Sequence, residues 1–297
     1  MPLATSAIRP LDLLLPALLL GGLVALLGVQ TGIWQALQPT SPELAPAVTT
    51  IPAHAYSYRL TGDFLRDGIP VDGPLVSETP AHPLDIMTYP VSAADYARCV
   101  AFAACLAAEP RRHSKGNVPV TGVNFGDATA YATWLSAQTG QTWRLPTVAE
   151  WTFAAGSKAS DPALTRSTDA TNPADRWLAL YEKEAALGAN ALAAPQPLGS
   201  FGTNEFGVAD LAGTVWEWTT TCGSRTSFDA AGATVGHLDS CGVRYLEGRH
   251  RTAVSGFIRD ALAGGCSSGT PPDNLGFRLV RDWPWYRSLA YLWNPNA

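Results

Sequence analysis

The chain has 297 residues, which is enough for one large domain or two small ones with a buried core. Its formal charge of −5 and its pI of about 5.5 give no sign of the basic surface that nucleic acid requires, so we expect no nucleic-acid partner. The 27 glycines and 23 prolines favour a loop-rich fold over a helical bundle.

The N-terminal segment is apolar and carries no charged side chain from Leu13 to Pro42. A helix needs roughly 20 apolar residues to cross a bilayer, and we predict a transmembrane anchor over residues 11–37. A cleaved signal peptide is the alternative, although the block is long for one and no clear small-x-small cleavage site follows it. Arg9 precedes the block and the next basic residue is Arg59, so the positive-inside bias predicts a cytoplasmic N-terminus.

This anchor predicts a single-pass membrane protein. Residues 1–10 form its cytoplasmic tail, and the main domain lies in the periplasm or outside the cell. Residues 38–55 contain four prolines among Ser, Thr and Ala, which predicts an extended linker. No internal repeat follows, so we expect one domain over 56–283. The tail of 284–297 is rich in aromatic residues and could pack on the domain, lie at the membrane surface or contact a partner.

Strand and helix signals follow one another through the first part of the domain. Residues 58–68 predict a strand and a turn, and 85–88 predict another short strand. Ser92 is a suitable N-cap for the helical run AADYARCVAFAACL. A second helix is expected over 127–139, and Gly140 is placed to end it.

The third predicted helix covers 148–155. Thr147 precedes it, and Glu150 three residues later completes a capping box. Regular patterns then fade, because the following segment is rich in Ala, Asp, Asn and Pro and predicts long loops. Strand signals return at 207–220 and at 276–282.

The five cysteines fall into two local pairs and one remainder. Cys99 and Cys105 bracket a short Ala-rich segment, and Cys222 and Cys241 flank an insertion rich in Gly, Ser and Asp. An oxidising compartment permits disulfides, so we predict one bridge within each pair and leave Cys266 unpaired. Zinc is the alternative, but no Cys-x2-Cys spacing occurs.

Several motifs occur in a fixed order along residues 58–282. The longest is PVTGVNFGDATAYATWLSAQTGQTWRLPTVAEWTFAAG, preceded by TGDFLRDG and YPVSAADYARCV and followed by NEFGVADLAGTVWEW and NLGFRLVRD. Together they resemble the motifs of the formylglycine-generating-enzyme, or sulfatase-modifying factor, family. The resemblance implies an α+β, loop-rich fold that is related to C-type lectins and binds calcium.

The resemblance also implies calcium ligands. In family members they include a carboxylate in the Trp-Glu-Trp motif and an asparagine further upstream, which fall here on Glu217 and Asn190. The family's Gly-Asn before this motif is Gly213-Thr214 here. Calcium takes six to eight oxygen ligands, many of them carbonyls of irregular backbone, which a loop-rich domain can supply. The alternative is that Glu217 forms hydrogen bonds within the core.

The resembled enzymes oxidise a substrate cysteine to formylglycine with copper, which a Cys-x4-Cys pair holds ahead of the last strand. Copper(I) prefers such thiolate ligands. Counting back without gaps places the pair at His250 and Ser255, and a shift of two residues gives no cysteine either. Only Cys266 remains in this region, so we expect no copper. The region still defines a candidate pocket, formed by His250, Ser255, Arg259 and Asp260.

Two functions are compatible with these motifs. The first is a non-catalytic binding or accessory module, whose pocket holds a peptide, a ligand or a membrane-protein partner near the bilayer. The second is a metal-dependent oxidase with a diverged site. No His-x3-His pair and no P-loop supports a catalytic site, and a lone His250 is more often structural. We therefore predict the binding module.

Overall fold

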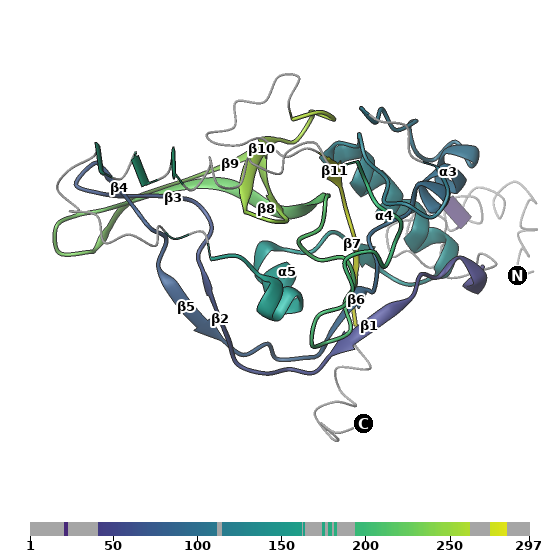
Figure 1. Ribbon diagram of the computed structural model, residues 1–297, viewed down its shortest axis with the longest axis horizontal. Coiled ribbons are helices and arrows are strands. Elements are labelled where there is room, and N and C mark those ends of the chain that lie inside the picture. The colour runs from purple at the N-terminus through teal and green to yellow at the C-terminus, as the bar shows by residue number, and fades with distance from the viewer. Residues whose placement is uncertain are drawn as a thin grey trace, which may run out of the picture.

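The computed structural model describes residues 21–22, 41–111, 115–161, 163, 174–175, 178–179, 181–182, 194–261 and 274–283. Short strands, few helices and long loops make up this part of the chain, which is a mixed α+β fold (Figure 1). The predicted α+β, loop-rich fold class is therefore confirmed for the described residues.

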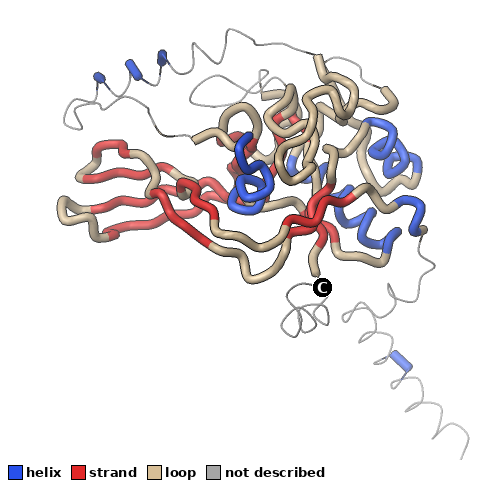
Figure 2. The backbone as a smooth tube through the Cα atoms, turned by 60° about the horizontal axis from the view of Figure 1, so that its bottom comes forward, coloured by secondary structure: helices blue, strands red, loops and turns tan. Residues whose placement is uncertain are grey.

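The larger sheet has six strands and is built on one long hairpin. Strands β8 and β9 form this hairpin, and β3 adds to the other edge of β8 in parallel. Figures 1 and 2 show that the far part of the hairpin lies at the opposite end of the molecule from α3 and α4. The strands are β3 (Asp63–Arg66), β4 (Ile69–Val71), β8 (Trp216–Phe228), β9 (Thr234–Glu247), β10 (Thr252–Ser255) and β11 (Leu275–Gly276).

A four-stranded sheet in the order β1-β6-β12-β7 lies to the right of α5 in Figure 1. Its strands are β1 (Val48–Ile51), β6 (Leu84–Met87), β7 (Trp143–Arg144) and β12 (Val280–Arg281). A separate two-stranded ribbon pairs β2 (Tyr56–Arg59) with β5 (Leu75–Glu78).

Two helices begin at the caps that the sequence indicates, and a third begins earlier. Helix α3 (Ala93–Ala101) begins after Ser92, whose hydroxyl accepts a hydrogen bond from the backbone N–H of Asp95 at 3.0 Å. Helix α5 (Val148–Ala155) has the predicted capping box. Helix α4 (Phe125–Thr139) begins two residues earlier than expected, because Asn124 and Asp127 form a capping box of their own, and Gly140 ends it with φ of 67°. Short 3₁₀ helices cover η1 (Pro42–Leu44) and η2 (Gly156–Lys158).

Two hydrophobic clusters form the core. The larger one packs α3 and α4 against β8 and the segment that contains Phe277. The smaller one surrounds α5, where Trp151 packs with Ile51 of β1 and Val280 of β12. Because β11 and β12 contribute to different sheets, the segment between them ties the two clusters together.

Two sequence predictions need correction. The expected linker of 38–55 is part of the domain from residue 41 onwards, because β1 pairs with β6 and Ile51 is fully buried. The β-branched run VTTI explains this pairing, since such residues favour strands. The expected closing strand over 276–282 is in fact two short strands, β11 and β12, separated by Phe277–Leu279.

Within the part of the chain that the structure describes, no helix is long and apolar enough to cross a membrane. The predicted anchor of 11–37 lies outside the described residues except at 21–22, and the tail of 284–297 lies outside them entirely.

Candidate functional site

The glutamate of the Trp-Glu-Trp motif is one half of a buried ion pair. Glu217 lies on β8, and both of its oxygens accept hydrogen bonds from the guanidinium of Arg278 at 2.6 Å. The indole N–H of Trp151 donates to Oε2 of the same carboxylate, also at 2.6 Å. The side chains of Arg278 and Glu217 are 0% and 2% exposed. The remaining guanidinium donors reach the carbonyls of Met87, Thr88 and Ala209.

This arrangement does not fit a calcium ligand at Glu217. Both carboxylate oxygens already accept hydrogen bonds from Arg278. A divalent cation bound to the same carboxylate would lie next to a buried guanidinium, and the two positive charges would repel each other. The residue therefore plays the role that the alternative gave it, as an acceptor within the core. Asn190 lies outside the described residues. That the chain binds calcium at another position stays a prediction.

The structure separates two of the four residues in the candidate pocket. His250 precedes β10 and its ring packs edge-on against Trp216 at 5.2 Å between centroids. Ser255 is the last residue of β10, where it pairs with Val243. A four-residue strand is roughly 13 Å long, so the two positions given by the ungapped register lie at opposite ends of this strand and could not share one metal ion.

Arg259 and Asp260, the other two residues of the candidate pocket, form ion pairs that fix the position of the loop after β10. Arg259 binds both oxygens of Asp127, at 2.7 and 2.8 Å, and also contacts Glu109. Asp260 accepts from Arg111 at 2.9 Å. Asp127 is the third helical residue of α4 and part of its capping box, so these pairs fix the loop against the start of that helix. Both charges therefore have a structural role.

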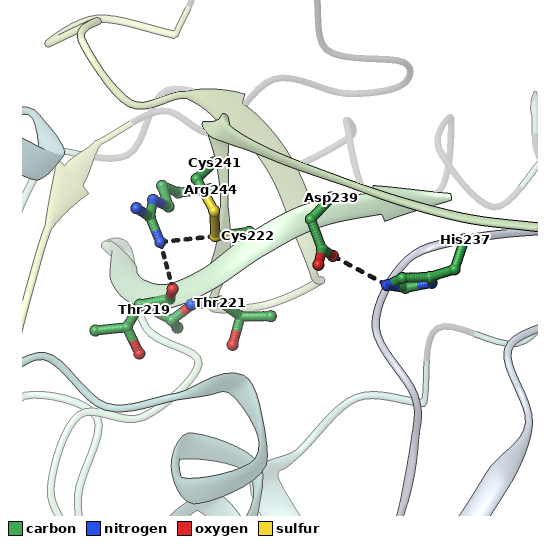
Figure 3. The surroundings of a disulfide bond; sticks show 8 residues. Thr219, Thr221, Cys222, His237, Asp239, Cys241 and Arg244 are labelled. Carbon is green, nitrogen blue, oxygen red and sulfur yellow. Dashed lines mark hydrogen bonds and ion pairs between the residues drawn. A yellow bond between two sulfur atoms is a disulfide. The ribbon is translucent and has the colours of Figure 1, made fainter. Parts of the chain in front are cut away.

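Both predicted disulfides are confirmed. Cys99–Cys105 closes the end of α3, where both residues belong to the larger core cluster. Cys222–Cys241 links β8 to β9 (Figure 3). Cys266 lies outside the described residues.

Sequence reasoning missed a cleft of about 450 Å³ beside α5, within the range of small-molecule sites. Its walls come from segments that are far apart in the sequence, and they combine aromatic rings with charges of both signs. The residues are Tyr56, Pro80, His82, Pro83, Leu84, Asp85, Arg144, Glu150, Phe153, Arg281, Asp282 and Trp283. The RLPT and GFRLVRD motifs meet here because β7 pairs with β12. These two motifs were the only sign of this cleft that the sequence offered.

The charges of this cleft form two paired groups. Arg144 donates to both oxygens of Glu150 at 2.6 and 2.7 Å and to Asp282 at 2.8 Å. Arg281 donates to Asp85 at 2.7 Å. Burial alone would raise the pKa of Glu150, but the hydrogen bonds and charge of Arg144, with the hydrogen bonds of Thr147, lower the pKa below its usual value.

Replacing Glu150 with glutamine should therefore destabilise the fold in a pH-dependent way. A carboxyl whose pKa is lower in the folded state contributes stability above its unfolded pKa of about 4.3, and this contribution is lost as the pH falls through the folded value. We expect Glu150→Gln to cost about 1–2 kcal/mol near pH 7, and the difference from the unchanged chain to shrink below about pH 4. Urea unfolding at several pH values measures this.

The matched control is Glu43→Gln, at an exposed carboxylate of η1. It should leave the unfolding free energy within about 0.5 kcal/mol at every pH. A difference for Glu150→Gln that does not change between pH 7 and pH 3 would show that this ion pair has no such role.

The chain matches the family model described as the sulfatase-modifying factor enzyme 1-like domain over residues 36–283. It is 38% identical to the formylglycine-generating enzyme of Mycobacterium tuberculosis over 110 residues, which cover 35% of this chain and 33% of the relative. It is 30% identical to the formylglycine-generating enzyme of Streptomyces coelicolor over 174 residues, covering 56% and 53% of the two chains.

A third relative, from Mus musculus, bears the name inactive C-alpha-formylglycine-generating enzyme 2. It is 30% identical over 175 residues, which cover 56% of this chain and 50% of the relative. The aligned regions thus span a third to about a half of the length of these relatives.

The fold has a solved counterpart in PvdO from Pseudomonas aeruginosa, with a TM-score of 0.53 at 24% identity. That match covers 81% of this chain and 96% of PvdO. It supports the fold, and the family model covers most of the chain. The chain belongs to the sulfatase-modifying factor enzyme 1-like domain family.

Proposed function

We propose that this chain is a non-catalytic member of its family, a membrane-anchored binding module on the extracytoplasmic side. The observation that carries the proposal is the state of the cysteines. The sequence has five, and four of them form Cys99–Cys105 and Cys222–Cys241.

Copper(I) in a bis-thiolate site needs two free sulfur ligands close together. With both disulfides formed, Cys266 is the one thiol left in the sequence. A hydroxyl such as that of Ser255 does not replace a thiolate for this soft ion. A single chain therefore lacks the ligands for the copper chemistry that the resemblance implies. The name of the mouse relative in its turn supports the existence of inactive members of this family.

The compartment and the membrane attachment are inferred together. Disulfides persist in oxidising compartments, so two of them support a domain outside the cytoplasm. The apolar segment of 11–37 would then anchor the chain with its N-terminus inside. A domain held close to the bilayer in this way is suited to act as an accessory subunit of a membrane protein.

The cleft beside α5 is the surface that we assign to binding. Tyr56, Phe153 and Trp283 give it aromatic walls, and the side chains of Arg144 and Asp282 stay 38% and 39% exposed despite their ion pair. Such a cleft offers both charges to a peptide segment of a partner protein. The relation of the fold to C-type lectins and the binding of calcium stay predictions of the same proposal.

Copper binding to the purified full-length chain tests the proposal. We expect less than about 0.1 copper(I) per chain in competition with a thiol-free copper(I) chelator, because two thiolates are needed for tight binding. The formylglycine-generating enzyme of Mycobacterium tuberculosis serves as the positive control. Cys266→Ser should leave the value for this chain unchanged.

Copper or iron near one per chain would instead favour the metal-dependent oxidase. Calcium can be measured in the same sample. A value near one per chain would support the calcium prediction, and its ligands would have to be sought away from Glu217, whose oxygens bind Arg278.

A further inference from the structure

The two disulfides differ in their access to solvent. Cys99 is fully buried and Cys105 is 7% exposed, and both pack in the larger core cluster. Cys241 is exposed and Cys222 is half-buried. Because thiol–disulfide exchange needs an attacking thiolate to reach a sulfur atom, the second bridge is the more accessible of these two.

Cys241 lies on the exposed part of β9, at an irregularity in the hairpin. Cys222 lies opposite Arg244, whereas its neighbour Gly223 lies opposite Ser240. Residues 241–243 are thus left over on β9 between the two pairs, as in a β-bulge. Cys241 is the first of them and is exposed, like residues 234–240 before it, while Cys222 on β8 is half-buried.

The two sulfur atoms also differ in their electrostatic surroundings. The guanidinium of Arg244 donates a hydrogen bond to Sγ of Cys222 at 3.1 Å (Figure 3). The same Nη1 donates to the carbonyl of Thr220 at 2.5 Å, and the guanidinium lies 4.3 Å from the ring centre of Phe125. These contacts hold the cation in place independently of the disulfide.

One N–H donor of the Arg244 guanidinium has no acceptor among the described residues. This donor is Nε, which is buried. A thiolate on Cys222 would lie beside Nη1 of this guanidinium, and a guanidinium beside a thiolate stabilises it.

We propose that Cys222–Cys241 is a thiol-exchange site at which an incoming thiolate attacks Cys241 and Cys222 leaves. The attacking sulfur forms a new bond to Sγ of Cys241 while the bond between Cys241 and Cys222 breaks. The electron pair of that bond stays on Sγ of Cys222, which leaves as a thiolate beside Arg244. A better-stabilised leaving thiolate makes this step faster. The substrate class is a thiol, carried either by a small molecule or by a cysteine of a protein.

The test is exchange of the intact chain with glutathione at pH 8, stopped by acid and read by peptide mass mapping. We expect Cys222–Cys241 to react at least about tenfold faster than Cys99–Cys105, which serves as an internal control in the same molecule. The mixed disulfide should form on Cys241. A second arm replaces glutathione with a capped cysteine peptide at the same concentration. Faster exchange with the peptide identifies a protein thiol as the preferred source, and faster exchange with glutathione identifies a small thiol.

Arg244→Met tests the role of the cation. Methionine keeps an apolar stem on Phe125 but removes every donor, so exchange at Cys222–Cys241 should slow by about tenfold. Arg225→Met is the matched control, because Arg225 is an exposed arginine on β8, the strand of Cys222, and its replacement should leave the rate unchanged. The position of the adduct in the unsubstituted chain provides a readout that does not depend on how the variant folds.

Three results would overturn the assignment. The first is an adduct on Cys222, the second is exchange no faster than at Cys99–Cys105 in both arms, and the third is a folded Arg244→Met variant that reacts at the original rate.

Discussion

Replacing Arg278 with methionine should lower the free energy of unfolding by about 3–5 kcal/mol. The guanidinium is fully buried and holds both oxygens of Glu217, which is 2% exposed. The substitution leaves a buried carboxylate without its counter-charge, and such a group costs far more than an exposed one. Urea unfolding followed by tryptophan fluorescence measures the change.

The control for this prediction is Arg225→Met. Arg225 is 64% exposed and its nearest carboxylate oxygen, on Asp63, is 3.6 Å away, so its loss should cost less than about 1 kcal/mol. Combining Arg278→Met with Glu217→Gln should recover part of the lost stability, because no unpaired charge remains and glutamine can still accept from Trp151. Equal effects of Arg278→Met and Arg225→Met would contradict the interpretation of Glu217–Arg278 as a central structural pair.

The copper-treated full-length chain should leave the cysteine of a sulfatase-derived peptide unconverted, with less than one formylglycine formed per chain. The resembled activity requires copper(I) on two thiolates, and both disulfides of this chain withdraw their sulfur atoms from that role. Mass spectrometry of the peptide detects the aldehyde product. The formylglycine-generating enzyme of Mycobacterium tuberculosis provides the positive control under the same conditions.

Repeated turnover by this chain would contradict the proposed non-catalytic function. The Cys222→Ser variant shows whether such turnover depends on the exposed disulfide, because it removes Cys222 and frees Cys241. If conversion depended on this bridge, the chemistry would belong to the thiol-exchange site and not to the region around Ser255.

Features set by neighbouring residues were determined by the sequence alone. The N-cap of α3 and the capping box of α5 depend on side chains three residues apart, so Ser92, Thr147 and Glu150 could be identified without a fold. The two disulfides also followed from local spacing. The absence of any pair of free thiols required nothing beyond the count of five cysteines once these bridges were assigned.

Features that join distant segments were decided by the tertiary structure. Residues 48–51 looked like linker because their partner strand begins 33 positions later, at Leu84. The cleft beside α5 joins residues from Tyr56 to Trp283, and the cation beside Cys222 comes from the opposite strand through a shifted register. Side-chain periodicity reports which face of a strand is buried but not which strand it pairs with, because pairing depends on how the whole chain packs.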